Sequence, residues 1–118
     1  MHLHDLTIKK FHEGLLNKEF SALEITQESF DWIEKKDKEV GAYLSLNKDL
    51  AIRQAEAADL KIAKNEPIGM LSGVPLAIKD NILIEGLPAT AASKILKDYT
   101  ASYDATVIKK LKSAGAVF

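Results

Sequence analysis

The spacing of apolar residues predicts two helices at the start of the chain. Residues 5–18 show apolar positions at helical spacing, namely Ile8, Phe11 and Leu15, as an amphipathic helix requires. A second helix is expected from Ser21 to about Asp37, because residues 21–24 read Ser-Ala-Leu-Glu, the pattern of a capping box. Its expected inward positions are Leu23, Thr26, Phe30 and Ile33. Gly41 then breaks the helical pattern.

A third helix with a narrow apolar face is predicted from Asn47, as its cap, to about Lys64. Its inward positions are Ala51, Ala55, Ala58 and Ile62. Because most of these side chains are small, this helix can approach a neighbour closely. The charged residues expected to remain in water are Arg53, Glu56, Asp59 and Lys61. Residues 43–46, just before this helix, are expected to be extended.

The pattern changes at Pro67. Prolines, glycines and β-branched residues alternate from there to residue 91, which predicts short strands and tight turns. Residues 74–79 are expected to form a strand buried on both faces, since both faces are apolar up to the last position. Asp104 is expected to cap a last helix, with Gly115 after its end; its expected inward positions are Val107, Leu111 and Ala114. Residues 116–118 resemble the start of another strand.

This order of elements predicts an α/β fold with a mixed, largely parallel sheet. We expect one domain, with a helical segment at residues 1–66 and the start of an α/β core at residues 67–118. An apolar strand that stops at its third residue leaves its edge unprotected. We therefore expect the sheet to be incomplete and the chain to be the front part of a longer one.

Composition excludes several classes of function. Hydrophobic residues make up 47% and charged residues 28% of the 118 residues, with no apolar run long enough for a membrane span. The 16 basic and 17 acidic residues are interspersed, giving a net charge of -1, which argues against direct nucleic-acid binding. The absence of cysteine excludes thiolate chemistry. With no secretory signal at the start, the expected location is the cytoplasm.

Lys79 is the first candidate for a catalytic residue, because it is the last residue of the apolar run 74–79. Open α/β sheets bind ligands at the carboxyl ends of their strands. Burial without a counter-ion disfavours an ammonium, and a neutral lysine can take a proton from a serine hydroxyl. The alternative is a solvated lysine, or the partner of Asp80. Asp80 and Asn81 are expected to support the turn after Lys79.

Three motifs closely resemble the amidase-signature family: GMLSGVPLAIKDN at residues 69–81, GLP at residues 86–88 and SYDATV at residues 102–107. The resemblance implies the fold of that family, and it implies that Lys79 is the base of a serine, cis-serine, lysine triad. Asp80 and Asn81 take a supporting role in this interpretation, and no metal site is expected. The substrate-binding residues stay unknown.

Within the family, the motifs favour the glutaminase subunit of a tRNA-dependent amidotransferase. The implied function is hydrolysis of glutamine to supply ammonia for converting Glu-tRNA(Gln) to Gln-tRNA(Gln), and Asp-tRNA(Asn) to Asn-tRNA(Asn). The implied partners are B and C subunits, with misacylated tRNA bound by the complex. The resemblance implies no cofactor in this segment and ATP with Mg mainly in a partner subunit.

The sequence departs from the family pattern at one important point. The glycine- and serine-rich loop that carries both triad serines is absent from the 118 residues, so this segment alone is expected to be inactive. Ser72 and Ser93 are expected to stabilise turns or helix caps by local hydrogen bonds rather than to replace the nucleophile. Ala89 and Ala91 stand where family members often have threonine and cysteine. The three histidines, at positions 2, 4 and 12, are not expected to bind a metal.

Two other functions stay open on the sequence. One is a stand-alone amidase of the same family, acting on a small or fatty amide. The other is a non-catalytic module that docks on a partner through its helices or its strand edge.

Overall fold

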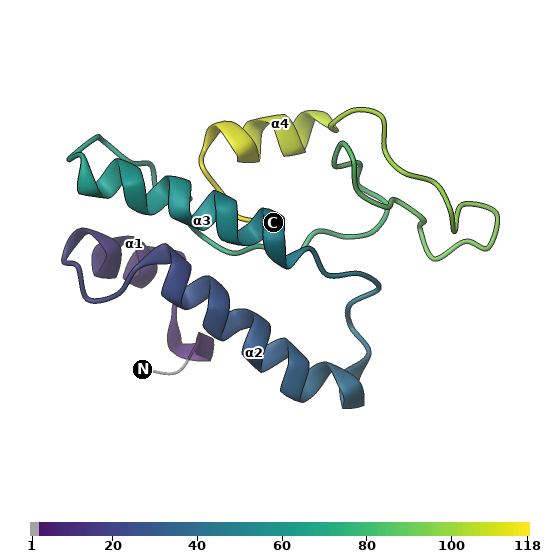
Figure 1. Cartoon of the computed structure of the whole chain (residues 1–118), viewed down its shortest axis with the longest axis horizontal. Coiled ribbons are helices and arrows are strands. Elements are labelled where there is room, and N and C mark those ends of the chain that lie inside the picture. Colours follow the sequence, from purple (N-terminus) through teal and green to yellow (C-terminus); the bar gives the residue numbers. More distant parts are fainter. Residues whose placement is uncertain (1–2) are drawn as a thin grey trace.

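The computed structural model describes residues 3–118, and the helices lie side by side at one end of the molecule (Figure 1). The elements in chain order are η1 Leu3–Asp5, α1 Ile8–Leu16, α2 Ala22–Val40, α3 Lys48–Ala63 and α4 Thr106–Ser113. Helix α3 lies between α2 and α4, and the long segment that joins α3 to α4 extends away from the helices (Figure 1). Among residues 3–118, no helix combines the length and apolar character that crossing a membrane requires.

Helix α1 confirms the first predicted helix but starts later. Residues 3–5 form a separate 3-10 turn, and the Thr7 hydroxyl caps α1 by accepting from the Lys10 NH at 3.2 Å. Phe11 and Leu15 are buried as predicted. Both side chains belong to the main core, which α1 shares with α2 and α3.

The capping box predicted for α2 is present. Ser21 Oγ accepts from the Glu24 NH at 3.0 Å, and the Glu24 carboxylate accepts from the Ser21 NH at 2.8 Å. The helix continues to Val40, a few residues beyond the predicted end, and stops at Gly41, whose φ of 62° is left-handed. Ile25, which the sequence interpretation did not place inward, is buried next to Thr26.

The prediction that Asp59 stays in water was wrong. Asp59 lies on α3 and is partly buried, and its two carboxylate oxygens accept from the Ala22 NH at 2.7 Å and the Leu23 NH at 3.0 Å. A helix N-terminus leaves its first NH groups without partners inside the helix. Asp59 and the capping box together bond the NH groups of residues 21–24. Asp59 therefore ties α3 to the start of α2, beside the buried alanines of α3.

The strands expected in the second half do not form in residues 3–118. An isolated parallel bridge joins Pro75 to Val117, and an isolated antiparallel bridge joins Pro88 to Thr100. Val117 NH donates to Val74 O at 2.9 Å and Leu76 NH donates to Val117 O at 2.8 Å. Beyond Leu76, the backbone up to residue 78 bonds no other segment in the described part. A strand needs a neighbour to pair with, and here a single bridged position provides one.

The prediction that residues 74–79 are buried on both faces was wrong, because these residues also lack neighbouring strands in the described part. Val74 is buried, but Ala77 and Lys79 are exposed and the other positions are partly buried. Residues 43–46, expected to be extended, are likewise exposed and form no strand.

Helix α4 also differs from the prediction at its start. Its N-cap is Ala105, and Asp104 instead accepts from the Glu85 NH at 2.8 Å and from Lys112 Nζ at 2.7 Å. The Lys112 ammonium and the Glu85 NH hold the pKa of Asp104 below its ordinary value. The buried residue of this helix is Ile108, whereas Val107, predicted to face inward, is exposed.

Candidate active site

Lys79 lies at the start of a turn and lines a wide groove. Its carbonyl accepts from the Ile82 NH at 3.0 Å, which closes the turn. Its side chain is exposed, and within residues 3–118 its ammonium has no ion pair or hydrogen bond. Of the two alternatives, the structure shows a solvent-exposed Lys79 and does not show an ion pair with Asp80 in the described residues.

The groove has a volume of about 820 Å³ and a largely apolar lining. One side is formed by residues of α2 and the loop 42–47, and the other by residues 75–82 with Leu87, Pro88, Ala91 and Ala92. Val117 and Phe118 also line it. Among the described residues that line it, the titratable side chains are those of Tyr43, Lys79 and Asp80. Most of the residues that line the groove with Lys79 are apolar, so covering the groove would take the ammonium out of water.

Asp80 connects the Lys79 turn to a second loop. Its Oδ2 accepts from the Thr90 NH at 3.1 Å and also from the Thr90 hydroxyl, and its carbonyl accepts from the Ala91 NH at 2.9 Å. Asn81 is exposed and lines the groove, with no side-chain hydrogen bond in the described part. Of these three consecutive residues, Asp80 is the one whose side chain bonds another segment within residues 3–118.

The loop that Asp80 holds has an unusual backbone. Ala91 and Ala92 have φ values of 48° and 55°, in the left-handed region that residues with a Cβ rarely adopt. Thr90 Oγ1 accepts from the Ala92 NH at 3.2 Å, so the hydroxyl both donates and accepts. The sequence did not indicate the bond between Asp80 and Thr90, because no local pattern pairs an aspartate with a threonine ten positions later.

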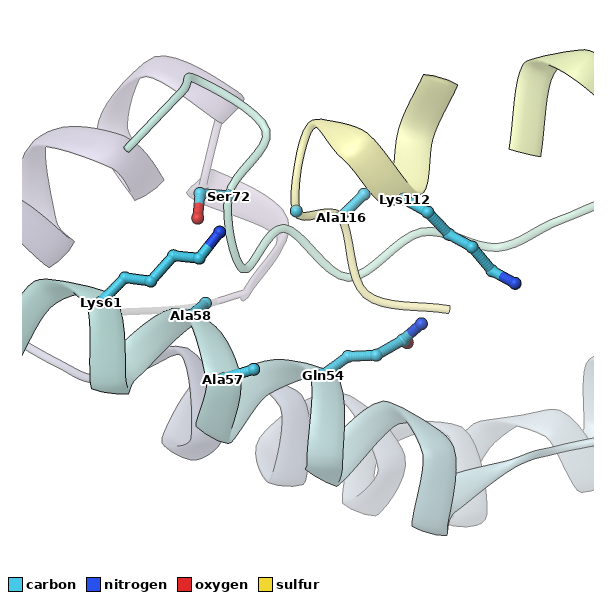
Figure 2. A pocket seen from close by; sticks show the side chains of 8 residues that line it. Gln54, Ala57, Ala58, Lys61, Ser72, Lys112 and Ala116 are labelled. Carbon is cyan, nitrogen blue, oxygen red and sulfur yellow. The ribbon is translucent and has the colours of Figure 1, made fainter. Parts of the chain in front are cut away.

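The two serines near Lys79 in the sequence occupy turns. Ser72 NH donates to Gly69 O at 3.1 Å and Ser93 NH donates to Thr90 O at 2.8 Å. Ser72 is buried and lines a different cavity, of about 240 Å³, between α3 and α4. Figure 2 shows Lys61 extending from α3 toward Ser72, whereas Lys112 extends away from it. Neither serine is bonded to Lys79.

No metal centre is found in residues 3–118, where no three histidine, aspartate or glutamate side chains are grouped as metal ligands. His2 lies outside the described residues. His12 is partly buried on α1, which does not contribute to the groove.

A family model for amidases matches residues 24–118. The chain belongs to the amidase family. This confirms the resemblance that the motifs around Lys79 indicated. The match includes the turn after Lys79, the loop at residues 90–92 and all of α3 and α4.

The curated relatives are A subunits of glutamyl-tRNA(Gln) amidotransferases. The chain is 45% identical over all 118 residues to the A subunit from Carboxydothermus hydrogenoformans, and covers 24% of that protein. It is 44% identical over 111 residues, or 94% of its length, to the protein of the same name from Trichormus variabilis, and covers 23% of that protein. The chain therefore spans about a quarter of the length of these relatives.

Solved structures of the amidase family share the fold. A structure from a vestigial protein complex linked to the origins of an s-triazine catabolic enzyme matches with a TM-score of 0.90 and 31% identity. A bacterial aryl acylamidase matches with a TM-score of 0.88 and 28% identity. Each match covers 95% of this chain, and 25% and 24% of the respective structures. The expected amidase-signature fold is thus confirmed, although the expected strands are not formed.

Proposed function

We propose that this chain is the N-terminal part of a glutaminase subunit that supplies ammonia for the conversion of Glu-tRNA(Gln) to Gln-tRNA(Gln), and of Asp-tRNA(Asn) to Asn-tRNA(Asn). The observation that carries the proposal is the 45% identity, along the whole chain, to the A subunit of a glutamyl-tRNA(Gln) amidotransferase. The position of Lys79 in an apolar groove, without a counter-ion in the described part, supports it.

In this proposal, Lys79 is the base of a serine, cis-serine, lysine triad. The nucleophilic serine attacks the side-chain amide carbon of glutamine, and its proton passes through the bridging serine to neutral Lys79. The C–N bond then breaks and the nitrogen takes a proton and leaves as ammonia. Water hydrolyses the resulting glutamyl ester to glutamate and restores the serine. Both serines lie outside these 118 residues, so the segment alone does not catalyse the reaction.

The remaining components belong to the complex. B and C subunits are the proposed partners, and a partner uses ATP with Mg to activate the misacylated tRNA. The net charge of -1 leaves tRNA binding to other parts of the assembly. The proposed location is the cytoplasm, where tRNA is aminoacylated.

A stand-alone amidase is the second candidate. The observation that favours it is the similarity to structures of a bacterial aryl acylamidase and of the peptide amidase from Stenotrophomonas maltophilia, which has a TM-score of 0.86 and 27% identity. The lower identity to these structures than to the amidotransferase subunits ranks this function second.

A chimera tests the proposal. Residues 1–118 of this chain are joined to the remainder of the Carboxydothermus hydrogenoformans relative and expressed with the partner subunits of that relative. We expect glutaminase activity that rises with ATP and misacylated tRNA. Lys79→Ala and Lys79→Arg should each lower kcat by about 10²- to 10⁴-fold, since a general base is lost. Lys35→Ala, at an exposed lysine of α2, is the matched control.

Two results decide between the candidates. Full glutaminase activity in both Lys79 variants contradicts the proposed role of the lysine. Hydrolysis of small amides without any response to ATP and tRNA supports the stand-alone amidase instead.

A further inference from the structure

We infer that Thr90 is a positioning residue for Lys79, acting through the carboxylate of Asp80. The inference rests on the proposed function, because it takes Lys79 as the base. Thr90 does not touch the lysine itself. Its backbone NH and its hydroxyl both donate to Asp80 Oδ2, so one residue supplies two donors to one carboxylate oxygen.

The contacts of Thr90 and Asp80 join two loops that lie ten residues apart in the sequence. Asp80 directly follows Lys79, and its backbone carbonyl accepts from the Ala91 NH at 2.9 Å. Together with the two bonds from Thr90, this fixes the turn that begins at Lys79. Because a base must be held in line with the proton it accepts, the stiffness of this turn contributes to the reaction.

Thr90 also stabilises the unusual backbone of the next two residues. Ala91 and Ala92 both have positive φ, and their NH groups donate to Asp80 O and Thr90 Oγ1. Backbone held in such sparsely populated conformations persists when surrounding bonds over-determine it, and it concentrates at functional sites. Ala91 and Ala92 line the same groove as Lys79. The strained loop therefore forms part of the wall beside the lysine.

The hydroxyl has an electrostatic consequence as well. The carboxylate of Asp80 bonds Thr90 and makes no ion pair with Lys79 in the described part. Without the Thr90 hydroxyl, only the Thr90 NH still holds Asp80 Oδ2, at 3.1 Å, so the carboxylate turns more readily toward the neighbouring ammonium. An opposite charge nearby favours the protonated form of a lysine. The other titratable side chain that lines the groove is that of Tyr43, in the loop before α3. Thr90 thus keeps Asp80 from suppressing the base.

The test uses Thr90→Val, which removes the hydroxyl at nearly constant shape, in the chimera described above. We expect kcat to fall by about 10- to 100-fold, as a small misplacement of a catalytic group produces, with little change in KM. The acidic limb of the pH–rate profile should move to higher pH. Thr90→Ser should restore both kcat and the profile, because it retains the hydroxyl. Thr106→Val, at an exposed threonine of α4, is the matched control.

The outcomes separate this inference from the proposed function. If the Lys79 variants are inactive but Thr90→Val keeps the kcat and pH profile of the unmodified chimera, the inference is wrong and the proposed function stands. If the Lys79 variants are active, both fail. A loss of kcat in Thr90→Val without movement of the pH profile contradicts the electrostatic role.

A second measurement uses the 118-residue chain itself. Hydrogen exchange followed by NMR should show that Thr90→Val removes the protection of the Ala91 and Ala92 amides, while Thr90→Ser keeps it. Equal protection in both variants overturns the inference without any activity assay.

Discussion

Replacing Asp59 with alanine should destabilise the fold more than the same replacement at an exposed charged residue of α3. The Asp59 carboxylate accepts from the Ala22 NH at 2.7 Å and the Leu23 NH at 3.0 Å. Alanine removes both acceptors and leaves two NH groups at the start of α2 without a protein partner. It also removes a negative charge from the positive end of the α2 dipole.

The magnitude follows from these contacts. Loss of a capping side chain costs about 0.5–2 kcal/mol, and the loss of favourable charge at a helix N-terminus adds about 0.3–1 kcal/mol. Because the site is partly buried, water replaces the lost bonds only in part. We therefore expect a decrease of about 2 kcal/mol in the free energy of unfolding. Asp59→Asn, which keeps one oxygen acceptor, should cost about half as much.

Urea unfolding followed by circular dichroism measures the effect, with the slope m checked for constancy. Glu56→Ala is the matched control, because Glu56 is an exposed acid on the same helix with no hydrogen bond or ion pair in the described part. It should change the free energy of unfolding by less than about 0.5 kcal/mol. If Asp59→Ala is no more destabilising than this control, the capping role assigned to Asp59 is wrong.

Two further predictions concern the second half of the chain. Gly73→Ala should lower the free energy of unfolding by about 2–4 kcal/mol, because Gly73 has a φ of +76° and an added Cβ would lie 2.8 Å from the Cβ of Ala22. Gly69→Ala is the control, because a Cβ added there meets nothing within 4 Å. Equal urea midpoints for the two variants would refute this prediction. Asp104 has a pKa below its ordinary value of 3.8, so its ion pair stabilises the fold above about pH 4 and the stabilisation is lost as the pH falls further. Asp104→Asn should therefore lower stability at pH 7 and flatten its decline toward pH 2 in urea titrations, whereas an unchanged decline would show that the ion pair does not contribute.

The location of the groove matters for both proposals. It lies between α2 and the residues that follow Pro75, and α3 keeps these segments together through Ala51, Ala55 and Ala58 in the core. Gly73 sits at this junction, with its NH bonded to Gly115 O at 2.8 Å. The position of Lys79 thus depends on the packing of helices that are distant from it in the sequence.

Lys79, Asp80 and Asn81 were selected from the sequence because they lie at the end of an apolar run, and the amidase motif around them made the selection specific. The sequence did not indicate that Asp80 would bond Thr90, since the two residues are ten positions apart and belong to different loops. The expected burial of residues 74–79 failed for a related reason. A pattern of apolar residues shows that a segment is suited to burial, but the neighbouring segments determine whether it is covered.

The sequence alone predicted the helices of the first half, apart from the later start of α1, the later end of α2 and the cap of α3, where the Asn47 side chain makes no cap hydrogen bond. Their caps and ends, such as the bonds between Ser21 and Glu24 and the left-handed Gly41, involve residues within a few positions of each other, so local pattern is sufficient to predict them. Tertiary structure decided the partners of Asp59, Asp80 and Asp104. Each carboxylate accepts from the backbone NH of a distant residue, at sequence separations of 37, 10 and 19 respectively. A carboxylate in a sequence is compatible with many donors, and only the packing of distant segments brings one of them within bonding distance.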